Sequence, residues 1–172
     1  MCFLADRLED ADVLVTDKLR RTAKLMCAMA RGMPVVGPSW IAQSKMTKTF
    51  LDPWQYIIKD EESEKKWRFS LANSLAAAGK KPLLKGLTVH ATKGCAPPPE
   101  MLKQMVEASS GRWTNTLPTS SPDHQVIVIS CEKDKATYNK ALKKGVKVYQ
   151  TELLLLGLLR QELDFESHQI IK

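Results

Sequence analysis

Short apolar runs alternate with helix-length segments along the whole chain. The runs VLV at 13–15 and PVV at 34–36 flank a segment that reads as a helix. The run VIVIS at 126–130 is likewise followed by a segment that reads as a helix. Strands that alternate with helices are typical of a parallel sheet with both faces covered. The pattern therefore predicts an α/β fold.

The chain contains two copies of one unit. Residues 13–41 align with residues 126–154 if one gap is allowed, and each copy reads as strand, helix, glycine, short strand and second helix. The glycine stands where a helix needs a left-handed residue to end. A repeat of this kind predicts two similar structural units in the chain. The aligned pairs are Thr16 and Ser130, Gly32 and Gly145, Val35 and Val148, and Trp40 and Leu153.

A further strand and helix precede the second copy. Residues 83–94 read as the strand, and residues 97–111 read as a helix that begins with prolines, which a first helical turn tolerates. Residues 83–172 therefore make a complete unit of about four strands and three helices. Before it, residues 59–82 form a charged linker with a helix near 70–78.

The first copy, residues 1–58, is expected to be incomplete at its N-terminus. Only about a dozen residues precede its first apolar run, too few for the strand and helix that precede the same point in the second copy.

Composition and charge narrow the class of protein. The chain has 172 residues, of which 44% are hydrophobic and 26% charged, and this favours a globular protein over a disordered one. Its net charge of +7 favours an anionic partner. No apolar run approaches the ~20 residues of a membrane span, and the first ten residues do not resemble a signal peptide. We therefore expect a nuclear or cytosolic protein with no membrane partner.

The cysteines and histidines do not have the spacing of a zinc site. No CxxC pair occurs, and the histidines are scattered. We expect free, mostly buried cysteines in a reducing compartment, and neither a metal nor a cofactor. The residues concerned are Cys2, Cys27, Cys95 and Cys131, with His90, His124 and His168.

Four cations, Lys18, Arg20, Arg21 and Lys24, crowd the N-terminal end of the helix predicted within 16–36. A helix N-terminus already carries roughly half a positive charge, so each exposed cation there costs about 0.3–1 kcal/mol. Residues three apart share a helix face, as Arg21 and Lys24 would. Together with free backbone N–H groups they predict a site for an anion such as a phosphoserine.

Taken together, these segments resemble a tandem BRCT repeat. The resemblance is carried by residues 14–41, the linker EKKWRFSLANSL, the helix start GCAPPPEM and the segment TELLLLGLLRQE, with Trp40 the most recognisable residue. It implies two BRCT units, each a parallel four-stranded sheet flanked by three helices. It also implies head-to-tail packing, with the second helix of the first unit against the first and third helices of the second.

The resemblance also implies a phosphopeptide ligand and a role for each site residue. Lys24 matches the lysine that holds the phosphate. Arg21 matches the arginine that holds the peptide main chain three residues on, or its terminal carboxylate, and Glu152 matches the acidic residue that braces this arginine. The strand that carries the family's other phosphate ligands, a Ser or Thr and a Gly, is expected to be absent from this chain, and Thr16, on a different strand, is a poor substitute. The side chain three residues on would lie in a groove lined by Met26, Pro98 and Leu155.

The function that the resemblance implies is a nuclear, monomeric adaptor in the DNA damage response. Its partner would be a phosphorylated protein tail, for which the damage-marked variant histone is one candidate.

Two other functions stay open. Some BRCT domains grip phosphorylated DNA ends, and a basic surface could contact DNA in that way. A purely structural scaffold is the second alternative. An enzyme is not expected, because the chain has neither GxGxxG nor GxxxxGK[ST] and no paired carboxylates or Cys–His arrangement. The basic residues considered for DNA are Arg20, Lys80, Lys81, Lys143 and Lys144.

Overall fold

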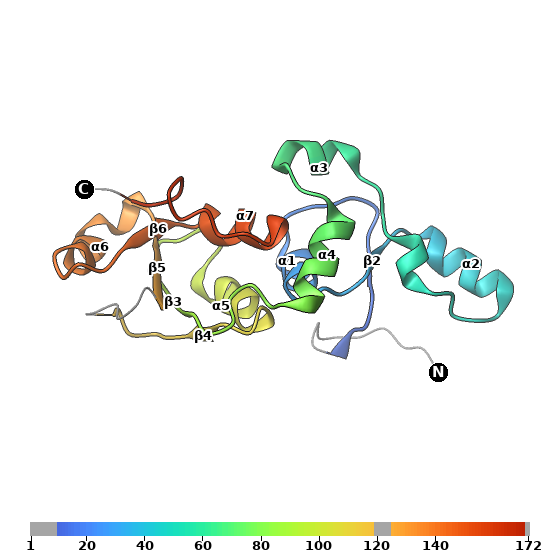
Figure 1. The fold of residues 1–172 in the computed structure, drawn as a ribbon, viewed down its shortest axis with the longest axis horizontal. Coiled ribbons are helices and arrows are strands. Elements are labelled where there is room, and N and C mark those ends of the chain that lie inside the picture. Colours follow the sequence, from blue (N-terminus) through green and yellow to red (C-terminus); the bar gives the residue numbers. More distant parts are fainter. Residues whose placement is uncertain (1–9, 119–124, 171–172) are drawn as a thin grey trace.

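The computed structural model describes residues 10–118 and 125–170, which form two α/β units along the long axis of the molecule (Figure 1). Helices α1 and α4 lie between the two sheets, and α2 and α6 lie near opposite ends. The elements are β1 (Leu14–Val15), α1 (Ala23–Arg31), β2 (Val35–Val36), α2 (Ser39–Thr47), η2 (Pro53–Tyr56), α3 (Glu61–Trp67), α4 (Leu71–Lys80), β3 (Thr88–Ala91), α5 (Pro99–Ala108), β4 (Arg112–Trp113), β5 (Val126–Ser130), η4 (Glu132–Asp134), α6 (Lys135–Leu142), β6 (Val148–Gln150) and α7 (Glu152–Arg160).

The second unit has the predicted parallel sheet. Its strands lie in the order β4-β3-β5-β6, and every neighbouring pair is parallel. Helix α5 connects β3 to β4, and α6 connects β5 to β6, as parallel strands require, while α7 follows the last strand. The α/β class predicted from the alternation of strands and helices is confirmed.

The strand register agrees with the repeat alignment. Leu14 pairs with Val35 in the first unit, and Val128 pairs with Val148 in the second. The alignment places Val35 over Val148, so both copies use the same register between their two strands. The internal repeat is therefore structural as well as sequential.

A left-handed glycine ends the first helix of each copy, as predicted. Gly32 has φ +64° and Gly145 has φ +74°. At Gly32 a side chain is excluded for a second reason, because a Cβ there would lie 2.7 Å from the backbone nitrogen of Gly79. This close approach lets the end of α1 pack directly on α4.

The first unit is smaller over the part of the chain that the structure describes. There, β1 and β2 form a two-stranded parallel sheet, and one antiparallel bridge joins Val36 to Ile57. Residues 1–9, on which the expectation of an incomplete N-terminus partly depends, lie outside the described residues. The expected unit boundaries at 58 and 82 fall between elements, after η2 and after α4.

The linker holds two helices where the sequence analysis expected one. Helix α4 matches the expected segment and runs two residues further, whereas α3 is additional. The sequence carries a start signal for α3, since aspartate is a preferred N-cap residue. In the structure Asp60 is this N-cap and accepts a hydrogen bond from the Ser63 N–H at 3.1 Å. Acidic residues fill its first turn and lysines its last, an order that suits the helix dipole.

One hydrophobic core runs through both units. Helix α1 packs against α5 and α7 of the second unit and against α4 of the linker. Head-to-tail packing of two complete BRCT units stays a prediction. The buried side chains of this contact include Met26 and Met29 from α1, Leu102 and Met105 from α5, and Leu155 from α7.

Candidate functional site

Helix α1 begins later than the distribution of its cations suggested. Thr22 is the N-cap, and its hydroxyl accepts a hydrogen bond from the Leu25 N–H at 3.3 Å. The prediction that Arg21 shares a helix face with Lys24 is therefore wrong, because Arg21 precedes the cap. Both residues nevertheless lie at the N-terminal end of α1, where backbone N–H groups lack helical partners.

Two of the four clustered cations are engaged with nearby carboxylates. The Lys18 ammonium lies 2.9 Å from a carboxylate oxygen of Glu62, and the Arg20 guanidinium lies 2.8 Å from Asp17. Both of these cations therefore already have an acidic partner within the protein. Arg21 and Lys24 are the two that fit a ligand site.

Arg21 forms a two-pronged ion pair with Glu152, the first residue of α7. Its two terminal nitrogens donate to the two carboxylate oxygens at 2.7 and 2.8 Å, across 131 positions of sequence. The hydrogen bonds from Arg21 hold the pKa of Glu152 below its ordinary value, so this carboxylate is ionised at neutral pH. The Arg21 side chain is 27% exposed, which leaves part of the guanidinium accessible to a ligand.

Lys24 is exposed in the first turn of α1. No acidic residue lies in that turn, and over the described part of the chain Lys24 forms no ion pair. Its ammonium, the partly exposed guanidinium of Arg21 and the helix N-terminus therefore make an electropositive surface where the two units meet. Such a surface suits a phosphate and a nearby carboxylate.

The three residues expected to line a groove have different environments. Met26 is fully buried and Leu155 is 4% exposed, and both belong to the core between the units. Pro98, the N-cap residue of α5, is exposed. A role for the three in side-chain specificity stays a prediction.

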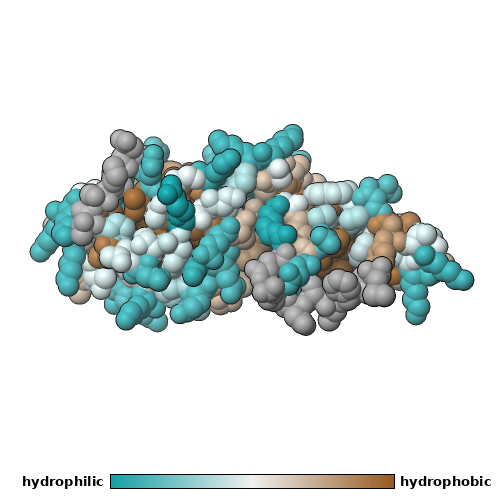
Figure 2. All heavy atoms as spheres, turned by 90° about the horizontal axis from the view of Figure 1, so that it is seen from below, coloured by the Kyte–Doolittle hydropathy of each residue, from teal (hydrophilic) through white to brown (hydrophobic). Residues whose placement is uncertain are grey.

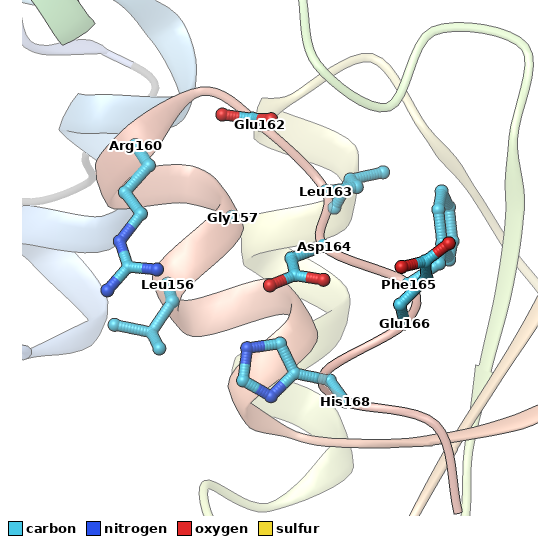
Figure 3. A pocket seen from close by; sticks show the side chains of 9 residues that line it. All are labelled: Leu156, Gly157, Arg160, Glu162, Leu163, Asp164, Phe165, Glu166 and His168. Carbon is cyan, nitrogen blue, oxygen red and sulfur yellow. The ribbon is translucent and has the colours of Figure 1, made fainter.

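A separate cavity of about 400 Å³ lies between α7 and the segment that follows it (Figure 3). It is lined by apolar side chains such as Leu156 and by charged ones such as Arg160 and Asp164. None of the predicted site residues lines it. The sequence analysis missed this cavity because the segment after α7 has no helical or strand periodicity.

The described part of the chain offers neither a metal cluster nor a membrane span. Within residues 10–118 and 125–170, no three His, Cys, Asp or Glu side chains are grouped to hold a metal ion. No helix in these ranges is both long and apolar enough to cross a membrane. Cys27 and Cys95 are buried and free, and burial raises the pKa of the Cys27 thiol to about 11. Cys2 lies outside the described residues.

Comparison with known sequences finds a family and curated relatives. Residues 82–168 match the BRCT domain family. Over 164 residues, the chain is 36% identical to human Mediator of DNA damage checkpoint protein 1. That alignment covers 95% of this chain and 8% of the human protein, so the chain spans less than a tenth of its relative.

Comparison with solved structures finds the same fold along nearly the whole chain. The BRCT5-BRCT6 domains of Brc1 from S. pombe superpose with a TM-score of 0.75 at 20% identity, and the match covers 93% of this chain and 82% of that one. Rtt107p in complex with a phosphorylated histone superposes with a TM-score of 0.67 at 9% identity, over 98% and 80%.

Proposed function

The chain belongs to the BRCT domain family, and from this premise we propose that it is a tandem BRCT module that binds a phosphoserine peptide. Lys24 is assigned to the phosphate. Arg21, braced by Glu152, is assigned to the peptide main chain or to its terminal carboxylate. The module acts as a non-catalytic adaptor.

One observation carries this proposal: at the N-terminus of α1, the ion-paired Arg21 lies beside Lys24, which forms no ion pair among the residues that the structure describes. The ion pair with Glu152 fixes the orientation of Arg21, which suits a planar ligand such as a carboxylate. Lys24 is a mobile point charge, which suits a phosphate of about −1.5 to −2 charges. Two cations of different character favour a ligand with two separated anionic or polar groups.

The relatives support a role in the DNA damage response. One of them is named as a mediator of a DNA damage checkpoint, and a structural neighbour is seen in complex with a phosphorylated histone. We propose a phosphorylated protein tail as the partner, with the damage-marked histone as one candidate, and the nucleus as the location. A monomer is sufficient, because Arg21 and Lys24 from the first unit and Glu152 from the second belong to one chain.

DNA binding has less support from the positions of the basic residues. Arg20 is paired with Asp17, and Lys80 and Lys81 end α4. Lys143 and Lys144 follow α6 near the end of the molecule away from α1 (Figure 1). These cations do not form one stripe with Lys24, whereas a DNA-binding surface usually needs a continuous row of phosphate contacts.

The test of the proposed function is a titration with matched serine and phosphoserine peptides that end in Ser-Gln-X-aromatic. We expect measurable binding of the phosphorylated peptide and at least tenfold weaker binding of the plain one. The titration is repeated at several salt concentrations, because DNA-like binding weakens steeply with salt in proportion to the phosphates contacted. Equal affinity for both peptides would refute the proposal.

We also infer that a further strand and helix complete the first unit. By the repeat alignment, Ile41 and Met46 of α2 correspond to Leu154 and Leu159 of α7. The two α7 residues are fully buried, whereas Ile41 is 52% and Met46 is 82% exposed. Apolar side chains lie open at the α2 end of the molecule (Figure 2). We propose that a strand and helix corresponding to β3 and α5 would cover Ile41 and Met46 in the first unit, and that the strand would bring the missing Ser or Thr and Gly.

An N-terminally extended version of this protein should therefore be more stable and should bind phosphopeptide more tightly. Burial of Ile41 and Met46 adds hydrophobic stabilisation of about 25 cal/mol per Å² of apolar surface. The measurements are melting temperature and phosphopeptide affinity, with an extension of equal length and scrambled sequence as the control. Equal melting and equal affinity in all three proteins would mean that the first unit needs no further strand.

A further inference from the structure

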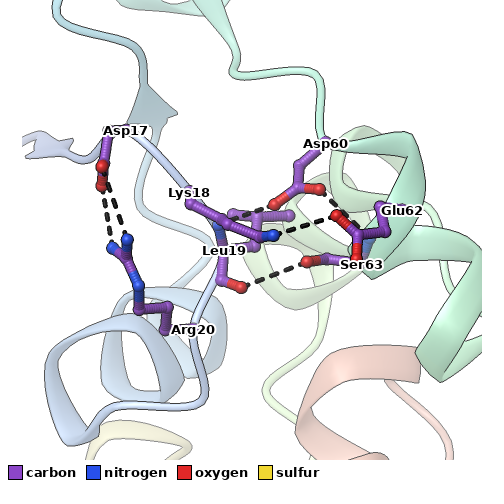
Figure 4. Close-up of polar contacts among 7 residues, drawn as sticks. All are labelled: Asp17, Lys18, Leu19, Arg20, Asp60, Glu62 and Ser63. Atoms are coloured by element: carbon purple, nitrogen blue, oxygen red, sulfur yellow. Dashed lines mark hydrogen bonds and ion pairs between the residues drawn. The ribbon is translucent and has the colours of Figure 1, made fainter.

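We propose that the linker helix α3 is part of the binding site and that Asp60 and Ser63 are positioning residues for Arg21. The inference rests on the proposed function and concerns the loop of residues 17–21, which leads from β1 into α1. Three contacts from the start of α3 hold this loop (Figure 4), and a contact from the end of α3 supports Arg21 itself.

Asp60 has two hydrogen-bonding tasks. One carboxylate oxygen accepts from the Ser63 N–H at 3.1 Å and so caps α3, and the other accepts from the Leu19 N–H at 2.9 Å. The second bond crosses 41 positions of sequence and joins the linker to the loop. The hydrogen bond from the Leu19 N–H is the main cause that lowers the pKa of Asp60, so the carboxylate is charged at neutral pH.

Ser63 holds the same loop residue from its other side. Its buried hydroxyl donates to the Leu19 carbonyl oxygen at 3.2 Å. Leu19 is therefore fixed through both its N–H and its carbonyl, and its side chain is 1% exposed. The Lys18–Glu62 ion pair adds an exposed contact one residue earlier. Figure 4 shows these side chains converging on the loop from the first turn of α3.

The other end of α3 reaches Arg21 directly. The guanidinium carbon of Arg21 lies 5.8 Å from the centre of the Trp67 ring, within the range of a cation–π contact. The Trp67 carbonyl oxygen accepts a hydrogen bond from Arg160 of α7 at 3.0 Å, which ties this end of α3 to the second unit. Arg21 is thus supported by Glu152 on α7, by Trp67 on α3 and by a loop that α3 anchors.

This arrangement makes the geometry of the site depend on the linker. Arg21 follows the anchored Leu19 by two residues, so a shift of the loop moves the guanidinium away from the Glu152 carboxylate. A shift of about 1 Å is enough to weaken a bidentate contact strongly, because the site must be held within about 0.5 Å of its productive geometry. Helix α3 of the linker therefore positions a site residue as well as connecting the two units.

The deciding variant is Asp60→Ser. A serine still caps α3 through one oxygen, but it has no second acceptor for the Leu19 N–H, so it separates capping from anchoring. Ser63→Ala removes the hydroxyl on the other side of Leu19 and serves as the second variant. Glu61→Ser is the matched control, since Glu61 is an exposed carboxylate of the same helix turn.

Two measurements are made on each variant. The first is affinity for the phosphopeptide with a free C-terminal carboxylate and for its amidated form. We expect Asp60→Ser and Ser63→Ala to weaken the carboxylate form about five- to tenfold and the amidated form less. They should have little further effect once Arg21 is replaced by alanine, as coupled residues do. Glu61→Ser should bind like the parent protein.

The second measurement needs no ligand. The Nε–H signal of Arg21 in a ¹⁵N NMR spectrum should be sharp in the parent protein and in Glu61→Ser, and shifted or broadened in Asp60→Ser and Ser63→Ala. If the parent protein does not bind phosphopeptide, the proposed function fails, and this signal still decides the positioning role. An unchanged Arg21 signal in Asp60→Ser and Ser63→Ala would overturn the inference. So would losses of affinity in these two variants that add fully to the loss caused by Arg21→Ala.

Discussion

Replacement of Lys24 by alanine is expected to erase most of the preference for phosphorylated over plain peptide. Lys24 is exposed in the first turn of α1, and its removal breaks no ion pair within the described residues. A hydrogen bond to a charged group is worth about 1.5–3 kcal/mol, which corresponds to a loss of about 10- to 150-fold in affinity for the phosphopeptide. Isothermal titration with both peptides measures the ratio directly.

Arg21→Ala should weaken peptide binding in a different way. It should weaken a peptide with a free terminal carboxylate more than the amidated peptide, and it should leave part of the phosphate preference intact. Lys140→Ala, which removes an exposed lysine from α6 of the second unit, is the control. It should change neither the ratio of affinities for phosphorylated and plain peptide nor the ratio for free-carboxylate and amidated peptide. The division of roles between Lys24 and Arg21 would be wrong under two joint results. Both variants would lose the preference for phosphorylated peptide to the same extent, and both would bind the free-carboxylate and amidated peptides with equal affinity.

Met26→Ala is expected to give the largest loss of stability. Met26 is fully buried in the core that α1 shares with the second unit, so its truncation leaves a cavity between the units. Truncation of a buried methionine costs about 2–5 kcal/mol in the free energy of unfolding. For a protein of this size that corresponds to a fall of about 4–20 °C in melting temperature. Differential scanning calorimetry measures it.

Met46→Ala provides a matched control for that prediction. The same change of side chain is made on α2, where Met46 is 82% exposed, and surface substitutions usually alter stability by less than about 0.5 kcal/mol. Similar melting temperatures for the two variants would show that the contact between the units contributes little to stability.

Local sequence signals were sufficient to predict much of the fold. Gly32 and Gly145 mark helix ends through their backbone conformation, which is a property of the residue itself. The apolar runs around Val35 and Val148 mark buried strands, and their alignment gave the correct register. These features depend on a few neighbouring residues, so one sequence is enough to show them.

The details of the candidate site depend on contacts that no local pattern encodes. Lys18 and Arg20 belong to the same run of cations as Arg21 and Lys24, yet the course of the loop brings each of them to a carboxylate. The start of α1 depended on which of several polar residues acts as the cap, and Thr22 does so. Asp60 carried a recognisable capping signal for α3, but its bond to Leu19 follows only from the packing of the linker on the first unit.

The shared core has a consequence for how this protein can be dissected. A fragment cut to residues 82–168 would retain its sheet but would expose the faces of α5 and α7 that α1 now covers, including Leu102, Met105 and Leu155. Such a fragment would tend to self-associate, and it would carry Glu152 without Arg21. Pull-down experiments on one half at a time would therefore separate Arg21 from Glu152 and could not test the proposed site. Ligand mapping in this protein calls for point substitutions in the whole chain rather than for deletions.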